Sequence, residues 1–128
     1  MTRAGERELM ARCGEFLWLT HWDSLAVPFY QAIGDNGRAI NADLLFGPGE
    51  VVGAGQRHTD GQQVLAALAA HDVDPEPYRW YVSMKQAAPM TTAGFGLGVE
   101  RFLMWLLCHD DIRDLQLWPR ANGRRTEP

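Results

Sequence analysis

The chain has few of the features that mark a secreted, membrane-spanning or zinc-binding protein. It has only two cysteines in 128 residues, Cys13 and Cys108, and they form no CxxC pair. Such spacing favours neither a disulfide framework nor a zinc site. No apolar run approaches the roughly 18 residues that a membrane-spanning helix needs, and the N-terminal stretch lacks the apolar core of a secretion signal. We therefore expect a cytoplasmic protein with no membrane segment.

Positive charge is also scarce. Twelve Lys and Arg stand against sixteen Asp and Glu, which gives a net charge of −4. Since nucleic-acid affinity usually depends on a basic surface, we expect this chain alone to bind tRNA poorly. Hydrophobic residues make up 46% and charged residues 22%, the composition of a soluble globular protein. We expect one domain over residues 1–120 and a disordered tail at 121–128, where Arg, Pro and Gly gather.

Apolar patterns and turn residues predict alternating strands and helices. The predicted strands span residues 16–22, 39–46, 50–56, 94–98 and 115–118, and the predicted helices span 6–12, 64–72, 99–108 and a segment that begins after Asp74-Pro75. Thr59 or Asp60 can cap the second helix. Hairpin-linked strands with helices beside them indicate an α+β fold with a mostly antiparallel sheet flanked by helices.

The stretch GFGLGVER carries glycine at alternate positions, Gly94, Gly96 and Gly98. It fits no P-loop, because no lysine lies between residues 94 and 108, and position 99 is valine where a dinucleotide fingerprint needs glycine. Residues two apart share one face of a strand. That face is therefore either a flat bed for a planar ring or a surface packed against another backbone.

The other face of the same stretch is apolar, with Phe95, Leu97 and Val99, and we expect it to pack into the core. Arg101 falls in the first turn of the helix that follows. There its guanidinium can stack on an aromatic base or contact phosphate oxygens.

A second polar set lies on the predicted hairpin. If the chain reverses at residues 46–49, strand alternation places Asp43 and Glu50 on one face, opposite an apolar row that includes Leu44 and Phe46. Diagonal neighbours on adjacent strands lie about 7–8 Å apart, near enough for two carboxylates to share a divalent ion. The alternative is a solvated hairpin face with two ordinary acids.

These segments together resemble a known family. GFGLGVER, the helix FLMWLL and the downstream DIRDLQLWPR resemble motif 3 of the class II aminoacyl-tRNA synthetases, in the aspartate and asparagine subgroup. The hairpin and the segments WDSLAVPFY and PEPYRWYVSMK match in order, so the resemblance covers about residues 5–120. It implies a partial class II synthetase-like core that binds ATP with Mg²⁺ and activates an amino acid by adenylating its carboxylate.

The resemblance also implies roles for individual residues. ATP would be bound by Gly94, Gly96, Gly98, Glu100 and Arg101, with Arg101 as the catalytic arginine near the adenine and the γ-phosphate. Magnesium would be held by Asp43 and Glu50. An Asp- or Asn-like amino acid would be bound by Gln56, Arg57, Lys85 and Thr92, with Arg57 on its side chain.

The chain departs from the family in two ways. Motif 1, which builds the dimer interface, and motif 2, which supplies an arginine for the α-phosphate, are not among these residues. We expect a truncated paralogue that works as a homodimer or with a chain supplying those motifs. Residues 85–93 also lack the family's arginine, aromatic-glycine pair and histidine, which leaves the amino acid open. A non-catalytic subunit that senses an amino acid or nucleotide, and a poorly folding fragment, remain alternatives.

Overall fold

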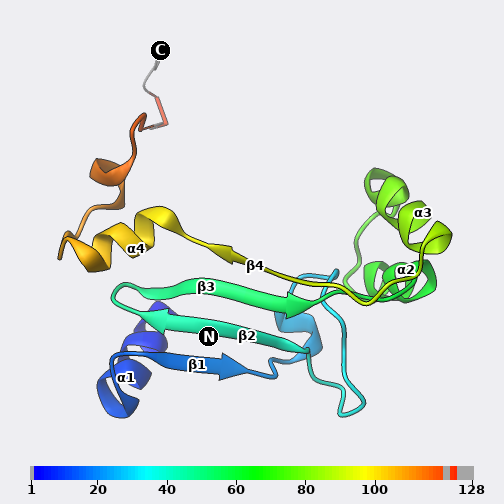
Figure 1. The fold of residues 1–128 in the computed structure, drawn as a ribbon, viewed down its shortest axis with the longest axis horizontal. Helices are drawn as coiled ribbons and strands as arrows, with labels where there is room; N and C mark the ends of the chain where they lie inside the picture. The colour runs from blue at the N-terminus through cyan, green and yellow to red at the C-terminus, as the bar shows by residue number, and fades with distance from the viewer. Residues whose placement is uncertain (1, 120–121, 124–128) are drawn as a thin grey trace. The chain divides into compact units, whose positions relative to one another are not determined.

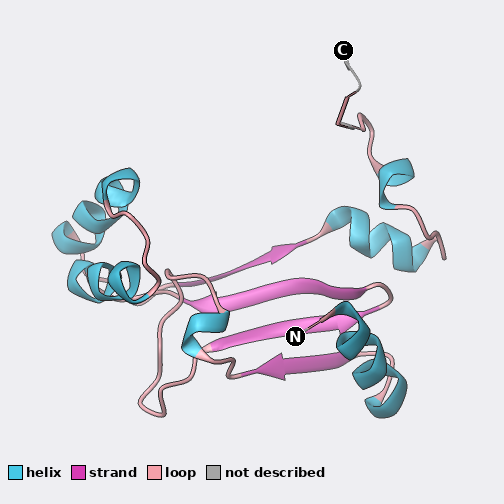
Figure 2. Cartoon of the chain, turned by 180° about the vertical axis from the view of Figure 1, so that it is seen from behind, coloured by secondary structure: helices cyan, strands magenta, loops and turns pink. Residues whose placement is uncertain are grey.

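The computed structural model describes residues 2–119 and 122–123. Its centre is a four-stranded antiparallel sheet in the order β1-β2-β3-β4. The strands are β1 (Leu17–Thr20), β2 (Asn41–Phe46), β3 (Gly49–Gln56) and β4 (Ala93–Leu97). Figures 1 and 2 show them running side by side, with β4 at one edge next to β3. The predicted hairpin at residues 39–56 is confirmed.

The helices lie close to where the sequence predicts them. They are α1 (Arg3–Cys13), α2 (Gly61–Ala70), α3 (Arg79–Ala87) and α4 (Val99–Leu106), with 3-10 turns at Ser24–Ala26, Glu76–Tyr78 and Ile112–Leu115. Asp60 caps α2 by accepting hydrogen bonds from the backbone N–H groups of Gln62 and Gln63, while the Gln63 side chain accepts from the Asp60 N–H. This capping box explains why α2 begins at Gly61. The α+β fold class is confirmed.

The chain divides into two compact units through which the strands run. The first unit comprises Met1–Leu17, Leu44–Val52 and Leu97–Pro128, and the second comprises Trp18–Asp43 and Gly53–Gly96. In the first unit an aromatic cluster joins the sheet to α4: the Phe46 ring centroid lies 5.2 Å from that of Trp105 and 5.4 Å from that of Phe16. The Phe46–Trp105 pair is edge-to-face, a geometry that stabilises beyond the buried area.

The core of the second unit lies between α2 and α3. Val64 and Leu68, one turn apart on α2, pack against Val82 of α3, and all three are buried. Phe29 and Tyr78 lie against this core with ring centroids 4.7 Å apart. No helix among the described residues is long and apolar enough to cross a membrane.

The strand predicted at residues 115–118 is wrong. Residues Ile112–Leu115 form a 3-10 turn, which begins where the Asp111 side chain accepts a hydrogen bond from the Arg113 N–H at 2.9 Å. Such local side-chain capping competes with extended structure. Leu117 is fully exposed. The tail that we expected to be disordered, 121–128, lies outside the described residues except for Asn122 and Gly123.

The expectation that Phe95, Leu97 and Val99 pack into the core is also wrong. Their exposed fractions are 74%, 44% and 58%. They do lie on an apolar face, but burial requires a second layer, and β4 is an edge strand. Among the described residues no such layer covers this face.

Gly47 provides a test of the first unit's packing. It adopts φ +56°, and a Cβ there would lie 2.6 Å from Trp105 Cβ, so Gly47→Ala meets both backbone strain and a clash. We expect a loss of roughly 2–5 kcal/mol in the free energy of unfolding, measured by urea denaturation. Gly37→Ala is the control: Gly37 has φ +73° with nothing within 4 Å, so only the backbone cost of about 1–2 kcal/mol applies. Equal losses would contradict the described contact with Trp105.

Candidate functional site

The glycine face of β4 is open. A Cβ built on Gly96 would meet no atom within 4 Å among the described residues. A Cβ on Gly94 would lie 3.7 Å from Arg57 Nη2, and one on Gly98 would lie 3.4 Å from Arg101 Cδ. The nearest atoms thus belong to arginine side chains, the guanidinium of Arg57 beside Gly94 and the aliphatic stem of Arg101 beside Gly98. The alternative of a glycine surface packed against another backbone does not describe this face.

In the first unit, the backbone of β3 positions the start of α4. The Gly98 N–H donates to the Val51 carbonyl at 2.9 Å, and Arg101 Nη1 donates to the Glu50 carbonyl at 2.5 Å. Arg101 is therefore held by a neutral acceptor, and its charge is not cancelled by that bond. Glu50 and Arg101 also line an open cavity of about 900 Å³ within this unit, together with Arg3 and Arg7 of α1.

The two proposed magnesium ligands belong to different units, Asp43 to the second and Glu50 to the first. Both side chains are partly accessible. Among the described residues no group of three or more His, Cys, Asp or Glu is placed to hold a metal. Magnesium bound to nucleotides commonly takes only one or two carboxylates, with phosphate and water oxygens as its other ligands. The donor chemistry of Asp43 and Glu50 fits that mode.

In the second unit, Thr92 brings together three of the four residues expected to bind the amino acid. Its carbonyl accepts from the Arg57 backbone N–H at 2.7 Å, and its hydroxyl accepts from Lys85 Nζ at 3.2 Å. Lys85 is only 3% exposed and also donates to the Met90 carbonyl at 2.9 Å. It holds the segment before β4. The fourth residue, Gln56, ends β3 immediately before Arg57.

The side chain of Arg57 is positioned by an aromatic ring. Its Cζ lies 4.3 Å from the centroid of Tyr30, a cation–π geometry. Arg57 Nη1 is enclosed and has no hydrogen-bond partner among the described residues. Arg57 also acts on Tyr81: burial raises the pKa of the Tyr81 hydroxyl, and the nearby Arg57 charge opposes that rise.

Three residues that sequence reasoning did not assign to the site, Tyr30, Gln31 and His58, contact or support Arg57. Gln31 pairs with Arg57 in an antiparallel bridge. The His58 imidazole, 7% exposed, lies with Nε2 3.0 Å from the Phe29 carbonyl and so holds the segment that carries Tyr30. Two features of the sequence signalled this region: the segment WDSLAVPFY, which ends at Tyr30 immediately before Gln31, and the position of His58 directly after Arg57.

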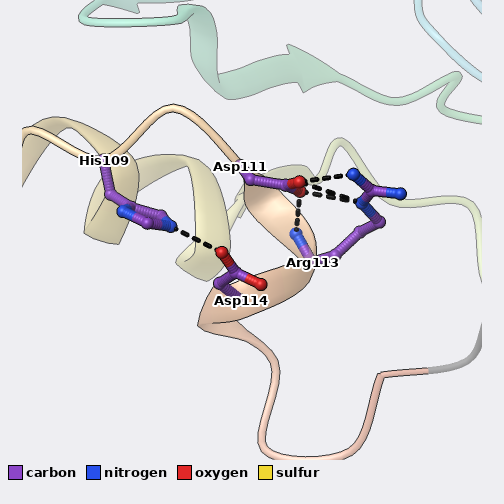
Figure 3. Close-up of polar contacts among 4 residues, drawn as sticks. All are labelled: His109, Asp111, Arg113 and Asp114. Atoms are coloured by element: carbon purple, nitrogen blue, oxygen red, sulfur yellow. Dashed lines mark hydrogen bonds and ion pairs between the residues drawn. The ribbon is translucent and has the colours of Figure 1, made fainter.

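Polar contacts also fix the segment after α4, as Figure 3 shows. Asp111 binds the Arg113 guanidinium at both oxygens, with Nε 2.9 and 3.1 Å away. These hydrogen bonds hold the pKa of Asp111 far below its ordinary value. His109 Nε2 lies 3.0 Å from an Asp114 oxygen. Arg113, one of the motif-like residues, is therefore already paired with a carboxylate.

Solved structures share this fold. The chain superposes with a TM-score of 0.87 on an Entamoeba histolytica asparaginyl-tRNA synthetase solved with asparaginyl-adenylate, at 32% identity over 98% of this chain and 30% of that one. A Pyrococcus horikoshii asparaginyl-tRNA synthetase, also solved with asparaginyl-adenylate, gives a TM-score of 0.88 at 28% identity, with the same coverage of both chains. The fold is that of the class II synthetase core.

Sequence comparison places the chain more narrowly. A family model for class II tRNA synthetases (D, K and N) matches residues 2–122, and the chain belongs to that family. A probable cytoplasmic asparagine–tRNA ligase of Encephalitozoon cuniculi is 32% identical over 94% of the chain and 28% of its own length. The chain spans less than a third of that relative. The family suspected from GFGLGVER is confirmed.

His58 makes stability depend on pH. Burial lowers the pKa of His58 from 6.5, outweighing the Phe29 hydrogen bond and the nearby Asp60, while Lys85 and His71 lower it further. The unfolded chain then binds a proton at a higher pH than the folded chain, so stability rises with pH through this window and is lost as the pH falls below about 6.5. We expect a larger drop in Tm between pH 7.5 and 5.5 for the unmodified chain than for His58→Gln. An equal drop in Tm in the unmodified chain and in His58→Gln would contradict the assignment of this pH dependence to His58.

Proposed function

We propose that this chain forms part of an amino-acid-activating site, in which it binds ATP with Mg²⁺ and an Asp- or Asn-like amino acid for adenylation of the carboxylate. The observation that carries the proposal is the open glycine face of β4, with Arg57 nearest to Gly94 and Arg101 nearest to Gly98. A flat backbone surface accepts an aromatic base, and guanidinium groups suit anionic oxygens. We expect the single domain predicted over residues 1–120 to carry this function.

In the first unit, we assign Arg101 to the adenine and the γ-phosphate as the catalytic arginine, with Glu100 and Gly98 beside it. The Glu50 carbonyl holds the guanidinium without neutralising it. A preorganised charge of this kind stabilises a developing negative charge without reorganisation. The adenine would lie on the backbone of Gly94 and Gly96.

Asp43 and Glu50 would hold the magnesium ion that accompanies ATP. When bound, the ion neutralises charge on the phosphates and makes the α-phosphorus easier to attack. The two carboxylates need only supply oxygen donors to an ion already bound by phosphate.

In the second unit, Arg57 would bind the side chain of the amino acid, and Gln56, Lys85 and Thr92 would complete the pocket. Lys85 acts chiefly by holding Thr92 and the Met90 carbonyl, because its ammonium is almost fully enclosed. The Tyr30 ring holds the Arg57 guanidinium, whose Cζ lies over it at 4.3 Å from the ring centroid.

The reaction would require charge neutralisation rather than a protein nucleophile. A carboxylate oxygen of the amino acid forms a bond to the α-phosphorus, the bond from that phosphorus to the bridging oxygen breaks, and pyrophosphate leaves. The α-phosphate arginine of the family's motif 2 is not among these 128 residues, and loss of one such donor commonly lowers the rate about 100- to 1000-fold. We therefore propose that the site works as a homodimer or with polypeptide that supplies motifs 1 and 2.

We place this activity in the cytoplasm, as for the cytoplasmic relative, and we expect tRNA recognition to require more than this chain. The net charge of −4 offers no general attraction for RNA.

The direct test is ATP–pyrophosphate exchange with a panel of amino acids, run on the chain alone and with added polypeptide bearing motifs 1 and 2. Exchange that depends on asparagine or aspartate is the expected result. Binding of an amino acid or ATP without exchange in either condition would instead favour a sensing subunit. If neither ligand binds, both assignments fail.

Gly96→Val tests the nucleotide face separately. The branched side chain fits the open space and suits a strand, so we expect no loss of folding stability. It occupies the proposed position of the adenine, and the Kd for ATP should rise at least about tenfold by isothermal titration calorimetry. Leu97→Ala alters the adjacent residue on the other face and should leave ATP binding unchanged. Unchanged ATP affinity in Gly96→Val would rule out this face.

A further inference from the structure

Gln31 and Arg57 lie directly opposite each other, although 25 residues separate them in the sequence. They form an isolated antiparallel bridge. The flanking hydrogen bonds run from Ala32 N to the Gln56 carbonyl at 2.8 Å and from His58 N to the Tyr30 carbonyl at 3.4 Å. Because these bonds bracket the pair, Gln31 and Arg57 are a non-hydrogen-bonded pair, whose side chains leave the same face and lie close together.

The two side chains end in complementary atoms that lack partners. Gln31 Oε1, an acceptor, and Arg57 Nη1, a donor, are both enclosed without a hydrogen bond among the described residues. An unpaired polar atom in such a position costs about 1–3 kcal/mol, and more when it carries charge. Both residues as a whole are partly accessible, so a ligand can approach the ends of these side chains.

Gly55 leaves the space that the Gln31 amide occupies. It lies two residues before Arg57, and alternation places it on the same face. A Cβ there would lie 2.8 Å from both Cδ and Oε1 of Gln31, which a side chain could not tolerate. With the Tyr30 ring 4.3 Å from Arg57 Cζ, the backbone and the ring hold the amide and the guanidinium in one place.

We propose that Gln31 determines specificity in this pocket by recognising a primary carboxamide. Its Oε1 accepts a hydrogen bond from the ligand N–H, while Arg57 Nη1 donates to the ligand carbonyl. A carboxylate offers two acceptors and no donor at neutral pH, so it would satisfy Arg57 but leave Gln31 Oε1 facing a second oxygen. The pocket therefore takes asparagine in preference to aspartate. This inference rests on the proposed function, since it concerns the same amino acid.

The test compares three ligands of nearly equal shape on the unmodified chain by isothermal titration calorimetry. They are L-asparagine, L-aspartate and the methyl ketone 2-amino-4-oxopentanoate, which keeps the carbonyl but has no side-chain N–H. We expect asparagine to bind about tenfold or more tightly than either of the others. A factor of this size corresponds to the loss of one hydrogen bond that leaves Gln31 Oε1 unpaired. This comparison needs no substitution and does not depend on a variant folding.

Gln31→Met then removes the acceptor while keeping the length of the side chain. Asparagine should lose about tenfold in affinity, and its advantage over the ketone should disappear. The matched control is Gln62→Met, the same change at an exposed position of α2, which should leave all three affinities unchanged.

Two results would overturn the assignment of Gln31. The first is an affinity for aspartate or for the ketone equal to that for asparagine in the unmodified chain. The second is a preference for asparagine that survives in Gln31→Met. Either outcome would remove the inference while leaving an amino-acid site in place. Failure of all three ligands to bind would remove the inference together with the amino-acid half of the proposed function.

Discussion

The absence of side chains on one face of β4 is the constraint on which the proposed site depends. Glycine at 94 and 96 weakens the strand, at about 0.5–1 kcal/mol for each glycine relative to alanine, because glycine loses more backbone entropy on folding. The strand is held by contacts beyond itself. After the strand, the Gly98 N–H donates to the Val51 carbonyl, and the aromatic cluster of Phe16, Phe46 and Trp105 packs α4. Before the strand, the Arg57 N–H donates to the Thr92 carbonyl.

The cations assigned to the site are held by neutral groups. Arg101 donates to a backbone carbonyl, Arg57 stacks on the Tyr30 ring, and Lys85 donates to the Met90 carbonyl and the Thr92 hydroxyl. Neutral partners fix position without cancelling charge, so the charges of Arg101 and Arg57 remain available to phosphate or to a polar ligand, whereas the enclosed Lys85 holds the segment before β4. Arg113 differs, because Asp111 pairs with its guanidinium through both oxygens. Arg101 and Arg57, held by neutral groups, are thus suited to bind a ligand, whereas Arg113, paired with a carboxylate, stabilises the local chain.

Local patterns predicted most of the fold. The Gly47-Pro48-Gly49 reversal, the Asp60 cap and the glycine-to-helix transition at Gly98 each depend on neighbours within a few residues, and each appears as predicted. The strand predicted at residues 115–118 does not form, because capping by the Asp111 side chain favours a 3-10 turn over a short alternating run. The prediction that Phe95 is buried was wrong, because burial requires a second layer over that face. The alternation of apolar residues in the sequence does not show whether such a layer exists. The pairing of Gln31 with Arg57 joins distant segments outside the named strands, and no local pattern signals it. The roles of Asp43, Glu50 and Arg101 in binding ATP remain predictions.

The central claim is that adenine lies on the open face of β4, and magnetisation transfer between ligand and protein tests it most directly. With ATP and Mg²⁺ added to the isotopically labelled chain, nuclear Overhauser effects should connect the adenine H2 and H8 protons to the Hα protons of Gly96. Protons of Phe95 point to the other face and should show none. Bound ATP whose adenine protons contact other residues and not Gly96 would contradict the account.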